Sequence, residues 1–122
     1  MEFKSFGEFA KHKRLNAGMT LRKFCKRYRY NPGNISKIER GIISPPIMPG
    51  KLERYAKCLG ILKGTEEWNQ FSDMASICAG KIPQSVLSDK ELVAKLPLIF
   101  KAFRELSNDE LCKLASKIKD EI

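Results

Sequence analysis

The sequence lacks the features of a metal-binding protein. It contains one histidine, and its four cysteines, Cys25, Cys58, Cys78 and Cys112, include no Cys-x-x-Cys pair. A zinc site would need both more ligands and closer spacing, so we expect no metal and no cofactor. Each cysteine falls where a helix would turn an apolar side chain inward, which predicts reduced thiols in the core. A redox-sensing or metal-sensing role remains the alternative.

Long apolar runs and catalytic motifs are also missing. No run approaches the roughly 18 residues of a membrane-spanning helix. Residues 1–14 contain no apolar stretch followed by a small-residue cleavage site, so we expect no signal peptide and a cytoplasmic protein without membrane contact. There is no glycine-rich phosphate loop, no nucleophile beside a plausible base and no carboxylate pair in a helix-packing context. We therefore do not expect an enzyme.

Positive charge is concentrated in the first half of the chain. The formal net charge is +9, but residues 1–60 carry 14 basic and 4 acidic residues, whereas residues 61–122 carry 9 and 10. The halves therefore have net charges of +10 and −1. A half that binds a polyanion accounts for this division, because each neutralised phosphate releases counterions and strengthens binding. A solvated basic face is the alternative reading of the charge alone.

Helix signals recur along the chain, and no strand-like alternation is sustained. The predicted helices span about 5–17, 21–28, 32–40, 51–59 and 65–79. Thr20 and Asn31 are suited to be N-caps, and Pro32 suits the first position of a helix, where its missing N–H is harmless. The proline-rich segment 42–50 is predicted to be an extended loop.

Two capping boxes predict further helices in the second half. They are Ser88–Glu91 and Ser107–Glu110, and each precedes an apolar run. Pro97 predicts a break or kink near Leu96. The predicted fold class is all-α, with a DNA-binding domain over residues 1–80 and a helical extension over residues 81–122 for dimer or partner contacts.

The pattern of residues 20–41 predicts a helix-turn-helix. Leu21, Phe24 and Cys25 supply the inward face of its first helix, and Ile35 and Ile38 supply that of the second. The outward positions of the second helix carry no bulky apolar side chain. Such a helix can enter a major groove. A buried helical hairpin would satisfy the same periodicity.

Two segments of this pattern, Thr20–Phe24 and Ile35–Gly41, resemble the helix-turn-helix of the lambda-repressor-like (XRE) regulators. The resemblance covers about residues 5–60 and implies a five-helix DNA-binding domain whose fifth helix begins near Thr65. It also implies a buried structural ion pair between Arg14 and Glu39. Base contacts are implied for the first residues of the third helix and for Lys37, and phosphate contacts for the region of Arg40.

Three features depart from the family's pattern. Arg29 stands where glycine is usual, so it must adopt a positive φ or reshape the turn. Leu21 replaces a frequent glutamine and removes one usual DNA contact. Pro32 and Gly33 offer no side-chain hydrogen bonds to bases, which leaves Asn34, Ser36 and Lys37 for direct readout. The predicted DNA-binding residues are Arg22, Lys26, Pro32, Gly33, Asn34, Ser36, Lys37 and Arg40.

The leading functional hypothesis is a sequence-specific DNA-binding transcriptional regulator, a repressor that acts as a homodimer on double-stranded DNA. The alternative is the antitoxin of a toxin–antitoxin pair, which would bind a protein toxin and repress its own operon. The apolar segment Leu96–Phe100, with Phe103 and Leu106, either packs on its own domain or forms an interface. Arg22, Lys26 and their basic neighbours either contact phosphates or are solvated surface charge.

Overall fold

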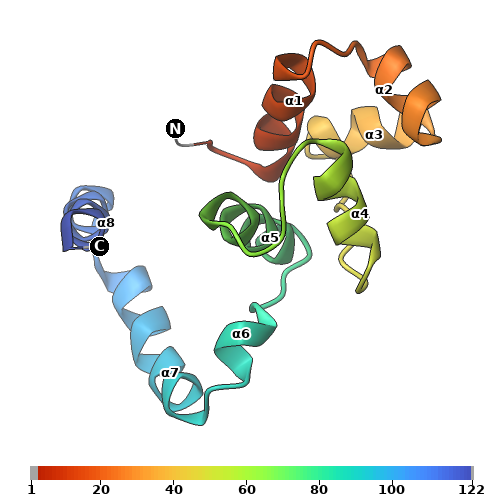
Figure 1. The fold of residues 1–122 in the computed structure, drawn as a ribbon. Helices are drawn as coiled ribbons and strands as arrows, with labels where there is room; N and C mark the ends of the chain where they lie inside the picture. The colour runs from red at the N-terminus through yellow and green to blue at the C-terminus, as the bar shows by residue number, and fades with distance from the viewer. Residues whose placement is uncertain (1–2, 122) are drawn as a thin grey trace. The chain divides into compact units, whose positions relative to one another are not determined.

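The computed structural model describes residues 3–121, and over this range the chain is all-helical, as predicted. The helices are α1 (Phe6–Asn16), α2 (Leu21–Tyr28), α3 (Pro32–Glu39), α4 (Lys51–Cys58), α5 (Glu66–Cys78), α6 (Gln84–Leu87), α7 (Lys90–Glu105) and α8 (Asn108–Glu121) (Figure 1). They fall into two compact units that divide between Pro83 and Gln84. Within residues 3–121, no helix is both long and apolar enough to cross a membrane.

Side-chain caps set the starts of the helices in the first unit. Thr20 Oγ1 accepts a hydrogen bond from the Lys23 N–H at 3.2 Å, and Asn31 Oδ1 accepts one from the Asn34 N–H at 3.1 Å. Thr65 caps α5 in the same way. Each cap satisfies a backbone donor that the first turn of a helix would otherwise leave unpaired. Local chemistry thus places α2, α3 and α5 where the sequence predicted them.

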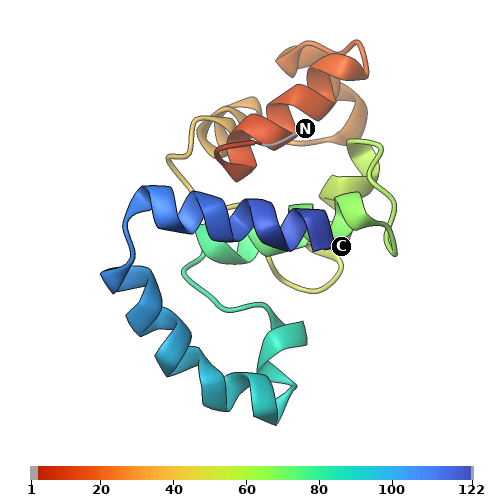
Figure 2. The ribbon, with the colours of Figure 1, turned by 90° about the vertical axis from the view of Figure 1, so that its left-hand side faces the viewer.

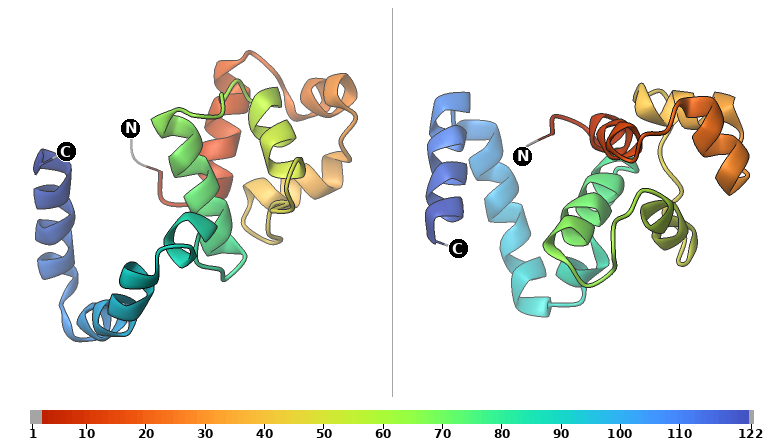
Figure 3. Two further views of the ribbon diagram at one scale, coloured as in Figure 1. Left: turned by 60° about the horizontal axis from the view of Figure 1, so that its bottom comes forward. Right: turned by 45° about the horizontal axis from the view of Figure 1, so that its top comes forward.

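The core of the first unit is built around aromatic rings, and all five of its helices contribute to it. Figure 3 shows the backbone of these helices, α1 to α5, in two further views. Phe6 of α1 and Phe71 of α5 have ring centroids 4.6 Å apart. Tyr55 of α4 lies 6.0 Å from Phe71 and 6.2 Å from Phe24 of α2. Ile35 and Ile38 complete the core from α3. Burying each such side chain contributes about 1.5–3 kcal/mol, so the cluster fixes how the helices pack.

Helices α1 and α3 meet at a glycine. A Cβ placed on Gly7 would lie 2.3 Å from the carbonyl oxygen of Glu39 and 2.6 Å from that of Ile38. Only a residue without a side chain permits this approach of α1 to the end of α3. The sequence reasoning did not single out Gly7, because nothing local distinguishes it from a poor helix former.

In the second unit, the predicted caps are only half correct. Ser107 and Glu110 form the expected capping box of α8, with both hydrogen bonds at 3.2 Å. The cap of α7 is Asp89 rather than Ser88, and its carboxylate accepts from the Glu91 and Leu92 N–H groups. The Ser88 hydroxyl instead donates to the Ser85 carbonyl, because Ser88 directly follows the short helix α6, which was not predicted.

Of the break or kink predicted near Leu96, the break is absent. Helix α7 runs without interruption through Pro97, and α8 then leaves its end at the Leu106–Ser107 junction (Figure 2). The missing N–H would have bonded to the carbonyl of Val93 four residues earlier. Val93 is exposed, so water can donate to that carbonyl instead.

The second unit has no buried side chain among its described residues 84–118. Its apolar groups face outward, and the exposed ones include Leu92, Leu98, Ile99, Phe100 and Phe103. Helical periodicity identified an apolar face correctly, but a face without a partner inside its own unit remains uncovered.

The prediction that all four cysteines are core thiols is wrong, because not every inward helix position is covered by another element. All four are free thiols, but only Cys25 is buried; Cys58 is half-buried, and Cys78 and Cys112 are exposed. Cys78 lies one turn beyond Ala75, where the core has ended, and Cys112 belongs to the unit without buried side chains. An inward position on a helix predicts a core thiol only where another element covers it.

We predict that Gly7→Ala destabilises the protein by about 1–3 kcal/mol, because the added methyl group overlaps the backbone of α3 rather than a flexible side chain. Urea unfolding followed by circular dichroism measures the change. Lys11→Ala, an exposed change on the same helix, is the control and should stay within about 0.5 kcal/mol of wild type. Equal stabilities of Gly7→Ala and wild type would contradict the close packing of α1 on α3.

Candidate nucleic-acid interface

The turn between α2 and α3 depends on the conformation of Arg29. Its backbone is left-handed, with φ 61° and ψ 46°, which is the first of the two alternatives that the sequence allowed. The N–H groups of Arg29 and Tyr30 both bond to the carbonyl of Cys25, which ends α2 sharply. Asn31 can then cap α3 after a connection of three residues.

Helices α2 and α3 divide their residues between the core and the outer surface. Phe24, Cys25, Ile35 and Ile38 are buried, as the helix-turn-helix pattern predicted. The exposed positions are Arg22 and Lys26 on α2, Pro32, Gly33, Asn34 and Lys37 on α3, and Arg40 after it. The face of α3 that remains outside is narrow and carries no large apolar group.

An ion pair fixes the end of α3 to α1. Arg14 Nε lies 2.8 Å from Glu39 Oε2, and Arg14 Nη2 donates to Glu39 Oε1 at 2.9 Å. The third donor, Nη1, bonds to the Met19 carbonyl just before α2. Both side chains are nearly buried, at 6% and 7% exposure. The hydrogen bonds that Arg14 donates to Glu39 raise the pKa of Arg14 against the opposing effect of burial, so Arg14 stays charged.

Arg54 of α4 provides a second support, which the sequence reasoning missed. Its Nη2 donates to the carbonyl of Tyr28 at 2.6 Å, where α2 ends. Its guanidinium also lies 4.7 Å from the centre of the Tyr30 ring. No local signal distinguishes Arg54 from the neighbouring Lys57, because only the packing of α4 against the turn assigns this role.

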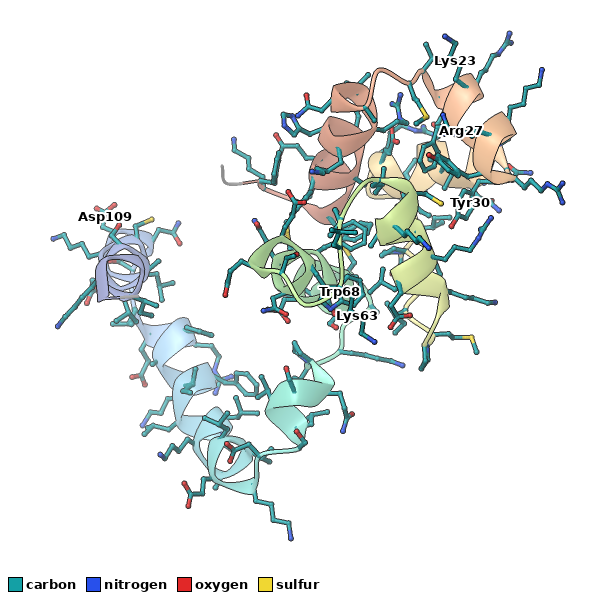
Figure 4. The ribbon with its side chains drawn as sticks, in the orientation of Figure 1. Lys23, Arg27, Tyr30, Lys63, Trp68 and Asp109 are labelled. Carbon is teal, nitrogen blue, oxygen red and sulfur yellow. The ribbon has the colours of Figure 1, made fainter. Side chains whose placement is uncertain are left out.

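The outer surface of α2 is basic and uncompensated. Arg22, Lys23, Lys26 and Arg27 are exposed, and none of them forms an ion pair with the described side chains of residues 3–118. Figure 4 shows Lys23 and Arg27 on this helix and Tyr30 in the turn that follows it. Unpaired basic groups on one helix give a positive surface that attracts phosphate.

Ser36 occupies a different position from the one predicted. It is half-buried, and its hydroxyl accepts a hydrogen bond from Arg40 Nε at 3.1 Å. The same Nε lies 3.3 Å from the Ser36 carbonyl, so Arg40 folds back over the end of α3. In this arrangement Asn34 and Lys37 are the exposed polar side chains of α3 that remain for base edges.

The part of the chain that the structure describes offers no group of three or more His, Cys, Asp or Glu side chains able to hold a metal ion.

None of the protein-family models, curated proteins or solved structures compared with the chain matches it. Any assignment of function therefore has to come from the residues themselves.

We predict that Glu39→Gln destabilises the protein by about 3–5 kcal/mol, because it leaves the buried charge of Arg14 without a counterion. Chemical denaturation measures the loss. Glu67→Gln is a matched control, since Glu67 pairs with Lys13 at 3.1 Å on a more open surface, where the side chains are 22% and 41% exposed. This control should cost less than about 1 kcal/mol. Similar losses in the two variants would show that the Arg14–Glu39 pair does not hold α1 to α3.

Proposed function

We propose that the first unit is a lambda-repressor-like DNA-binding domain and that the protein is a sequence-specific transcriptional regulator acting as a repressor. The supporting observation is the exposed face of α3, which is held rigidly by the core, the Arg14–Glu39 pair and the Asn31 cap, beside an unpaired basic helix. A rigid, narrow helix next to positive charge fits the major groove of double-stranded DNA.

The dimensions of α3 agree with this function. A helix with its side chains is about 10–12 Å in diameter, and the major groove is about 12 Å wide, so a helix such as α3, whose exposed face carries no large apolar group, fits into it. Asn34 and Lys37 are three residues apart and lie one turn from each other on the exposed side. Lysine is suited to guanine O6 and N7, and asparagine to adenine N6 and N7. Pro32 and Gly33 at the start of the helix let the backbone approach the groove closely.

Phosphate contacts would surround this reading surface. Arg22 and Lys26 on α2 and Arg40 at the end of α3 are exposed cations on the elements that border the groove in such a complex. Residues 1–83 carry 16 basic and 7 acidic residues, a net of +9, so the whole charge of the protein resides in this unit. Much of the affinity would therefore come from counterion release and fall steeply with salt.

The second unit is proposed to make the protein a homodimer. Residues 84–122 carry seven basic and seven acidic residues, so two copies can meet there without net repulsion, whereas two copies of the first unit would repel. The exposed apolar side chains of α7 supply the surface that such an interface would bury. Dimerisation would place two α3 helices on the half-sites of a two-fold operator.

The uncovered apolar residues of α7 also favour a second function. An antitoxin would use this unit to bind a protein toxin and the first unit to repress its own operon. The two functions differ in the partner that covers α7: a second copy of the chain, or the toxin.

We predict that Lys37→Ala weakens binding to a DNA sequence selected from a random pool by about 1–3 kcal/mol, roughly 5- to 150-fold, and leaves binding to random DNA nearly unchanged. Lys26→Ala is the matched change on α2. It should weaken binding to both DNA sequences equally, and it should lower the slope of log affinity against log salt concentration by about 1. Gel shifts across a salt series measure both effects. Equal binding of wild type to selected and random DNA, or no salt dependence, would overturn the proposed function.

We predict that Phe103→Glu turns the homodimer into a monomer, because it places a charge among apolar groups that the interface would bury. Sedimentation equilibrium of the full chain measures the change. Phe103 is 53% exposed, and Leu62 of the first unit, at 66%, gives a control, since Leu62→Glu should stay dimeric. A wild type that is monomeric at micromolar concentration would contradict the dimer and leave the toxin partner as the function of α7.

A further inference from the structure

The segment between α1 and α5 carries an excess of positive charge equal to that of the whole first unit. Residues 15–65 contain eleven basic and two acidic residues, a net of +9. Both acidic side chains are engaged locally: Glu39 pairs with the buried Arg14, and Glu53 accepts a hydrogen bond from the Gly50 N–H at the start of its own helix. The exposed cations of this segment therefore have no acidic side chain left to neutralise them.

Three arginines from two helices gather at the end of α2. The guanidinium of Arg27 lies 5.5 Å from the centre of the Tyr28 ring, and Arg29 follows in the turn with an exposed side chain. Arg54 of α4 reaches the same place, because its Nη2 donates to the Tyr28 carbonyl and its guanidinium lies 4.7 Å from the centre of the Tyr30 ring. Packing of α4 against the turn thus adds a third cation to the two that follow each other in sequence.

Lys57 extends this group along the outer side of α4. Burial raises the pKa of the neighbouring Cys58 thiol, and the positive charges of Arg54 and Lys57 oppose that rise, so both cations lie close to the same thiol. Lys57 is exposed, as is Arg54. The four exposed cations, here called the α2–α4 cluster, are Arg27, Arg29, Arg54 and Lys57.

The α2–α4 cluster is suited to an anionic partner. Like charges on one surface repel each other, and the negative ends of the dipoles of α2 and α4 offset this repulsion only weakly. A row of phosphates would remove the repulsion and release counterions. Arginine presents a fork of donors that matches phosphate oxygens, and the bond of Arg54 to Tyr28 uses one of its five N–H groups.

The position of the cluster separates it from the phosphate contacts proposed above. Arg22 lies at the start of α2, and Arg27 lies five residues later, about 7.5 Å further along the helix axis. Each DNA strand carries one phosphate per about 3.4 Å of duplex, so the two arginines face different phosphates. The cluster also precedes Asn31, the cap of α3, whereas Arg40 follows the end of α3.

We propose that the α2–α4 cluster binds the sugar-phosphate backbone of DNA outside the base pairs that α3 reads, so that flanking DNA of any sequence strengthens binding. Its members are all long cationic side chains, which contact phosphates without reading bases. This inference rests on the proposed DNA-binding function.

Two duplexes that share one selected site test the role of the cluster. The first is trimmed to the shortest length that the protein still distinguishes from random DNA. The second adds one helical turn of unrelated sequence, about 10 base pairs, at each end. Fluorescence anisotropy gives the Kd of the full-length protein for both duplexes over a salt series. We expect wild type to bind the longer duplex about tenfold more tightly at low salt.

The triple variant Arg27→Gln, Arg29→Asn, Lys57→Gln removes three charges of the cluster. Arg54 is kept because it also supports the turn, and asparagine tolerates the left-handed backbone of position 29. The gain from the longer duplex should fall below about threefold. On that duplex, the slope of log affinity against log salt concentration should decrease by about 3 per protomer, whereas on the shorter duplex it should change by less than about 1.

A matched control removes the same charge elsewhere on the first unit. It is the triple variant Lys4→Gln, Lys11→Gln, Lys81→Gln, at exposed positions before, on and after α1 and α5. This control should keep the tenfold gain of wild type. Circular dichroism compares the thermal midpoints of all three proteins. If the cluster triple variant does not fold, Lys57→Gln alone, on the exposed side of α4, decides the outcome, with an expected decrease in slope of about 1 on the longer duplex.

The outcomes separate this inference from the proposed function. Equal gains from the longer duplex in wild type, cluster variant and control overturn the flanking contact and leave the proposed function in place. An equal loss of affinity for both duplexes also overturns it, because the cluster would then contact phosphates of the selected site itself. A wild type that does not distinguish selected from random DNA overturns the proposed function, and the flanking contact with it.

Discussion

The geometry of the first unit depends on the ion pair between Arg14 and Glu39. It joins α1 to the end of α3 with two short hydrogen bonds, and the third guanidinium donor reaches the chain just before α2. Gly7 permits this arrangement, because a side chain there would overlap the carbonyl of Glu39. A buried pair of this kind adds little net stability, but removing one partner is costly, so it defines one orientation of α3 relative to α1.

The two units divide the physical requirements of the protein between them. The first unit buries an aromatic core and carries the whole net charge, and it leaves no large apolar side chain on the outside of α3. The second unit is neutral, and none of its residues over 84–118 is buried. A charged unit with a complete core is suited to a polyanion, and a neutral unit with uncovered apolar groups is suited to another protein surface.

The predictions that succeeded concern interactions between residues close in sequence. The caps Thr20, Asn31 and Thr65 follow from side chains within a few positions of the backbone groups they satisfy, and Arg29 adopts the positive φ that was one of its two alternatives. The cap of α7 was assigned wrongly although its contacts are local, because Ser88 follows the short helix α6 and bonds back to Ser85. The exposure of side chains required knowledge of neighbours in space: Ser36 is half-buried rather than exposed, and Cys78 and Cys112 lie on faces that no other element of their own unit buries.

The sequence by itself determined the helices, the concentration of charge and the apolar stripe that makes α2 and α3 a pair, because propensity, capping and periodicity act over a few residues. Only the tertiary structure decided what each side chain touches. It gave Gly7 its close approach and placed Arg54 of α4 against the turn at the end of α2. These features arise from contacts between segments 20 to 50 residues apart, whose packing no local pattern encodes.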